Sequence, residues 1–125
     1  PKNIEKIIDY MYQQGIDVGV TTNGSRKLEF YKKLLPKLSS LIFSYHMEYH
    51  NREVIPEHIV ALKKLALEQD RYIHVHVHMM MLPTMFDEAT TAIKYLKAND
   101  VPVVMRRIRP AYMKNENDSI TITDN

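Results

Sequence analysis

The chain has 125 residues, of which 45% are hydrophobic and 26% are charged, the composition of one ordinary globular domain. Its 17 basic and 15 acidic residues nearly balance, so neither a nucleic acid nor an acidic membrane is indicated as the main partner. The absence of cysteine excludes a disulfide scaffold and any thiolate ligand for zinc or an iron–sulfur cluster. The longest apolar run, Met79 to Leu82, is too short for a membrane span, and no signal peptide is visible. These features predict a cytoplasmic protein.

Helical and strand patterns alternate from the beginning of the chain. Apolar residues at helical spacing over residues 4–11 predict a first helix, which Gly15 ends. Residues 16–22 predict a short strand that runs into an Asn-Gly turn. Ser25 is the expected cap of a second helix, and Pro36 is expected to end or kink that helix.

The rest of the chain repeats this alternation. Pro56 suits the first turn of a third helix. Thr84 and Asp87 have the spacing of a capping box at the start of a fourth helix. Three further strands are predicted over residues 41–45, 72–82 and 101–107.

Short loops join each helix to the next strand, so the strands must be parallel and the crossovers right-handed. The sequence therefore predicts one α/β domain of four consecutive αβ units, over residues 1–110. Four units do not close a barrel, so the domain is either a small open sheet or part of a larger barrel. A polar tail follows over residues 111–125, in which Ile120 and Ile122 alternate with threonines. This tail is expected to form an edge strand or no element.

The second face of each predicted strand becomes polar toward the carboxyl end of the strand. Ligands of α/β proteins bind outside these carboxyl ends. Hydroxyl, amide, carboxylate, imidazole and guanidinium groups together suit a zwitterionic ligand that carries hydroxyl groups and a carboxylate. The candidate site residues are Thr21, Asn23, Ser44, His46, Glu48, His76, His78, Arg107 and Arg109. Alternation is expected to send Arg106 to the opposite side.

Histidines at spacing two, His74, His76 and His78, invite a metal interpretation. Such a site would need further ligands from neighbouring strands, which His46 and Glu48 could supply, and would make the protein a barrel-type metal-dependent hydrolase. The simpler interpretation is that the histidines line a polar cavity and form hydrogen bonds there, without a metal.

A third alternative is a non-catalytic α/β binding module. The outer strands over residues 16–22 and 101–107 would offer unpaired edges, and such edges invite pairing with another chain or a second copy.

The order of these segments resembles the core of the radical S-adenosylmethionine (SAM) enzymes. Residues 19–24, Gly-Val-Thr-Thr-Asn-Gly, are similar to the Thr-Asn-Gly segment that ends a strand in that family. Residues 44–48 resemble the next strand, and residues 75–83 and 103–110 resemble the two strands after it. The first helix resembles the segment that follows the family's Gly-Gly-Glu motif. The resemblance implies that the chain is part of a (βα)6 partial TIM-like barrel.

The resemblance also implies roles for the candidate residues. By position, Thr21 and Asn23 would lie near the amino group or carboxylate of SAM. Ser44 and His46 would contact its methionyl or ribose part, and His76 and His78 would line the ribose side or the substrate cavity. Contacts to a small-molecule or peptide substrate would come from Glu48, Arg107 and Arg109.

Radical SAM enzymes hold a [4Fe–4S] cluster on a Cys-x-x-x-Cys-x-x-Cys loop. The cluster cleaves SAM reductively, and the resulting 5′-deoxyadenosyl radical abstracts hydrogen from the substrate. This chain has neither the cysteines nor the Gly-Gly-Glu motif. Both are expected upstream of Pro1, so the resemblance implies a fragment that binds SAM and substrate but is inactive alone, with no catalytic or metal-ligating residue of its own.

Overall fold

The computed structural model describes residues 3–46, 54–81, 83–107 and 121–124. Helices and strands alternate along the chain, which confirms the predicted α/β class. The elements are α1 (Ile4–Gln13), β1 (Gly19–Thr22), α2 (Leu28–Leu34), the 3-10 turn η1 (Leu35–Lys37), β2 (Ser40–His46), α3 (Ile55–Leu67), β3 (His74–Met81), the 3-10 turn η2 (Pro83–Met85), α4 (Phe86–Ala98), β4 (Val103–Arg107) and β5 (Thr121–Asp124). Within the described part of the chain, no helix combines the length and apolar character that a membrane span requires.

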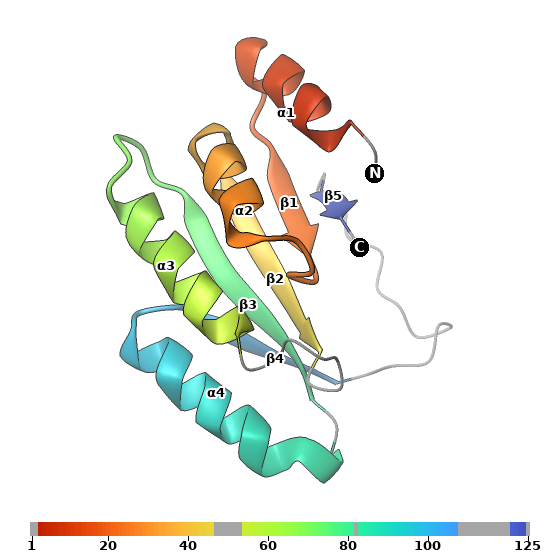
Figure 1. The fold of residues 1–125 in the computed structure, drawn as a ribbon, viewed down its shortest axis with the longest axis vertical. Helices are drawn as coiled ribbons and strands as arrows, with labels where there is room; N and C mark the ends of the chain where they lie inside the picture. Colours follow the sequence, from red (N-terminus) through yellow and green to blue (C-terminus); the bar gives the residue numbers. More distant parts are fainter. Residues whose placement is uncertain (1–2, 47–53, 82, 108–120, 125) are drawn as a thin grey trace.

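The strands form one sheet in the order β4-β3-β2-β1-β5, and every neighbouring pair is parallel. From β1 to β4, each strand lies beside the next one in the chain. Right-handed crossovers that always step in one direction place their helices on the same face of a sheet. Figure 1 shows α2, α3 and α4 over one face in this way.

The polar tail contributes β5, so the first of its two expected outcomes, an edge strand, is the observed one. β5 pairs with β1 from Gly19 to Thr22, and it therefore covers the strand edge that was expected to be open. Among the described residues, β4 is the other outer strand of the sheet.

One face of the sheet carries the hydrophobic core. Phe43 of β2 lies in register between Thr22 and Val77, and all three side chains are buried. The helices bury their own apolar positions in the same cluster, among them Ile8, Ile59, Leu62 and Leu96. We call this the helix-packed face; its positions on β1 to β3 are Val20, Thr22, Leu41, Phe43, Tyr45, Val75, Val77 and Met79.

Both predictions of a side-chain helix cap are wrong. α2 begins at Leu28, after Lys27, and α4 begins at Phe86, after Met85, and neither helix has a side-chain cap hydrogen bond. Thr84 lies inside the 3-10 turn η2, one residue before the N-cap position of α4, which Met85 occupies. The backbone N–H of Ser25 donates to Oδ1 of Asn23, so this serine belongs to the turn after β1.

Candidate ligand site on the polar face of the sheet

The second face of the sheet brings several of the predicted site residues together. Thr21 lies in register with Ile42, which lies in register with His76. Two residues further along the strands, Ser44 lies in register with His78. Another two residues further, His46 lies in register with Met80. These positions alternate with the buried core positions, so they face away from the helices. We call this the polar face; it comprises Thr21, Ser40, Ile42, Ser44, His46, His74, His76, His78 and Met80.

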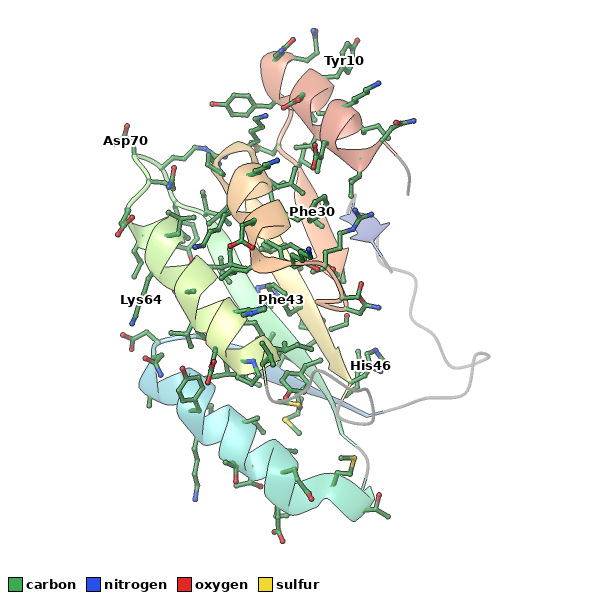
Figure 2. All side chains as sticks on the ribbon, viewed as in Figure 1. Tyr10, Phe30, Phe43, His46, Lys64 and Asp70 are labelled. Carbon is green, nitrogen blue, oxygen red and sulfur yellow. The ribbon has the colours of Figure 1, made fainter. Side chains whose placement is uncertain are left out.

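Side chains on the polar face are half-buried, apart from Ser44, which is 9% exposed. His46 is the last residue of β2, and Figure 2 labels its side chain at that end of the strand. The polar face therefore offers hydroxyl and imidazole groups near the carboxyl ends of β1, β2 and β3. This donor set can bind a polar ligand through hydrogen bonds.

Two of the remaining predicted site residues, Asn23 and Arg107, take backbone positions outside this face. Asn23 follows the last residue of β1, and its Oδ1 accepts the backbone N–H of Ser25 at 3.0 Å. In β4, Arg107 takes the register position beside Met81, in phase with the buried Met79. Arg106 takes the register position beside Met80 of the polar face, the phase that the sequence had suggested for Arg107. Glu48 and Arg109 lie outside the described residues.

A tyrosine fixes the turn that follows β1. The hydroxyl group of Tyr31 lies 3.0 Å from Oγ1 of Thr22 and accepts the backbone N–H of Arg26 at 3.2 Å. Oγ1 of Thr22 in turn accepts the N–H of Gly24, whose φ of 78° is a left-handed conformation that glycine adopts without strain. The Tyr31 ring packs edge-on against Phe43 in the core. The Thr-Asn-Gly segment is thus tied directly to the core through α2.

We expect Tyr31→Phe to destabilise the protein by about 1–2 kcal/mol, because it removes the hydroxyl group that joins Thr22 to the Arg26 backbone in a buried setting. Tyr31 is 1% exposed, whereas Tyr10 on α1 is 63% exposed, so Tyr10→Phe is the matched control and should change stability little. Urea denaturation measures both variants. Equal midpoints for the two would contradict the anchoring role of Tyr31.

Three histidine rings of β3 form a ladder on the polar face, and Tyr72, two residues before the strand, extends it by one ring. The hydroxyl group of Tyr72 lies 2.9 Å from Nδ1 of His74, and the rings of His74 and His76 have centroids 4.3 Å apart. The ladder continues to His78, whose Nε2 lies 3.2 Å from Nε2 of His76. One of these two nitrogens must carry a proton and the other must accept it. Hydrogen bonding between the histidines, as the simpler interpretation expected, is therefore present.

The hydrolase alternative requires at least three ligands for its metal. Among the residues that the structure describes, no group of three or more histidine, cysteine or carboxylate side chains could hold one ion. His46 pairs with Met80, two residues beyond His78, and Glu48 is outside the described residues. His76 and His78 are joined through their Nε2 atoms, 3.2 Å apart, and form a pair.

Sequence reasoning did not identify Thr22, Tyr31 or Tyr72 as contributors to the site. Thr22 belongs to the helix-packed face, so its hydroxyl group is buried where the alternation predicts an apolar residue. That exception to the pattern was the one available signal, since a buried hydroxyl group needs a partner. Comparisons of the chain with protein families, curated proteins and solved structures found no match.

Proposed function

We propose that the chain forms the C-terminal strands of the partial barrel of a radical SAM enzyme, where it binds SAM and lines the substrate cavity. The observation that carries the proposal is the polar face: donor groups from three consecutive parallel strands share the side of the sheet that faces away from the helices. In barrels, that side is the interior, and ligands bind at the carboxyl ends of its strands.

The strand order supports a piece of a barrel. β1 to β4 are neighbours in chain order, with no reversal among them, while β5 pairs with the outer edge of β1. In the assembled barrel, the preceding strand would take the place of β5 at that edge. A doubly wound sheet reverses its order near the middle and places helices on both faces. Four units stepping in one direction are what one side of a (βα)6 barrel requires.

The donor set fits SAM as a ligand. Ser44 and His46, near the end of β2, supply a hydroxyl group and an imidazole that suit the carboxylate and the ribose hydroxyl groups. Thr21 and the anchored turn at Asn23 lie at the end of β1, where the amino group would be held. His76 and His78 would contact the ribose or the substrate from β3.

The residues of this chain do not fit the iron–sulfur cluster, because the sequence contains no cysteine. Cysteines of another segment would have to hold the cluster. The role of this chain is to bind and orient SAM on the polar face, on the opposite side of the sheet from the helix-packed core.

The coding sequence upstream of Pro1 tests this proposal first, since it should contain three cysteines at the family's spacing. The polypeptide that includes this segment should, after anaerobic reconstitution, release 5′-deoxyadenosine from SAM. Ser44→Ala and His46→Ala should each weaken SAM binding by about tenfold, the effect of one hydrogen bond to a charged group. His58→Ala on α3 is the control, because α3 packs on the opposite face. A polypeptide without the cysteines, or without 5′-deoxyadenosine release, would refute the proposal.

A further inference from the structure

His76 and His78 approach each other more closely than their strand requires. Alternate residues of a β-strand are separated by about 6.5–7 Å along the backbone. The ring centroids of the two histidines are 5.0 Å apart, and their Nε2 atoms are only 3.2 Å apart. The two side chains therefore lean toward each other and bring their Nε2 atoms together.

The separation of the two nitrogens matches that of two ligands on one metal ion. Zinc–imidazole bonds are about 2.0–2.1 Å long, so two nitrogens on a tetrahedral ion lie about 3.3 Å apart. Two adjacent nitrogens in a square-planar copper or nickel site lie about 2.9 Å apart. The observed 3.2 Å lies between these values.

We infer that His76 and His78 form a two-imidazole chelate for a divalent late transition-metal ion, of the class of Zn²⁺, Ni²⁺ or Cu²⁺. Without metal, the two Nε2 atoms share one proton in a hydrogen bond. When the ion binds, the donor ring carries its proton on Nδ1 in place of Nε2, so that both neutral rings present an Nε2 lone pair and no net proton is released.

Exchangeable ligands complete the coordination of the ion. Because the described residues contain no group of three metal-binding side chains, the pair leaves positions for water or for a small anionic ligand. Ser44 lies in register beside His78, so a hydroxyl group lies on the neighbouring strand. Such an open site binds and polarises an oxygen ligand.

This inference goes beyond the proposed function and does not depend on it. The proposal for SAM rests on the donors that three strands share, whereas the chelate rests on the distance between two atoms of one strand. A metal titration in the absence of SAM therefore tests the chelate alone, and release of 5′-deoxyadenosine tests the other proposal alone.

The experiment is a calorimetric titration of the untagged, metal-free chain with Zn²⁺, Ni²⁺ and Cu²⁺ salts. We expect one ion per chain, with the highest affinity for Cu²⁺. His76→Ala and His78→Ala should each weaken binding by about tenfold or more, as loss of a group supporting the metal does. His58→Ala on α3, which packs on the opposite face of the sheet, is the matched control and should retain affinity within a few-fold.

A second measurement keeps the test independent of folding. The electron paramagnetic resonance spectrum of the Cu²⁺ complex should show two equivalent nitrogen ligands in the parent chain and one in each single variant, and circular dichroism should show that each variant is folded. Binding that persists in both variants, a spectrum without two nitrogen ligands, or no saturable binding up to millimolar metal would overturn the inference. The last result would leave a hydrogen-bonded pair only.

Discussion

Met79→Lys is expected to unfold the chain, while Met80→Lys, one residue further, leaves it folded. Met79 is fully buried on the helix-packed face, and Met80 is half-buried on the polar face. A lysine at position 79 would place an unpaired ammonium group in the core, which costs several kcal/mol, a large part of the roughly 5–15 kcal/mol that stabilises a domain. At position 80, the long side chain can extend its charged end into water, so we expect a loss of about 1 kcal/mol.

Chemical denaturation followed by circular dichroism compares the two variants directly. Because the substitution is identical and the positions adjoin, local strand propensity is the same for both, and only the face differs. Equal loss of stability in the two variants would contradict the assignment of the faces. That assignment is also what the proposed ligand site depends on.

Phe43→Ala should destabilise the protein by about 3–5 kcal/mol, the cost of removing a large aromatic side chain from a core. Phe43 is 1% exposed, packs edge-on against Tyr31 and lies beneath the turn at Gly24. The variant should therefore also loosen the turn that follows β1. Hydrogen exchange of the Gly24 and Arg26 amides measures this second effect.

Ile42→Ala is the matched control for Phe43→Ala. Ile42 is the preceding residue of β2, but it lies half-buried on the polar face, so we expect a loss of only about 1–2 kcal/mol. Exchange at Gly24 and Arg26 should stay slow in this variant. Faster exchange in both variants would show that the turn depends on strand β2 as a whole and not on the Phe43 ring.

The polar face was predictable from the sequence because strand side chains alternate with a period of two. His76 and His78 share a face in any sheet that contains their strand, and so do Ser44 and His46. The apolar residues between them identify the face that the helices must cover. This reasoning needs no knowledge of neighbouring strands, and for β1, β2 and β3 the structure agrees with it.

The relation of one strand to the next was not predictable in the same way. Period two places positions 106 and 107 on opposite faces, but it does not say which position shares a face with His76 and His78. β4 has apolar residues at Val103, Val104 and Met105, so both of its faces look alike. The pairing of Val104 with His78 decides the question, and that pairing depends on the length and path of α4.

The turn after β1 shows the same limit at shorter range. Ser25 satisfies the local rule for a helix cap, but the Tyr31 hydroxyl group from α2 already binds the Arg26 backbone, and α2 begins only at Leu28. The alternation of elements, the parallel strands and the two faces follow from the sequence because they depend on local periods and short loops. Tertiary packing decided the strand register and the pairing of β5 with β1, because each depends on groups that lie together only once the chain has folded.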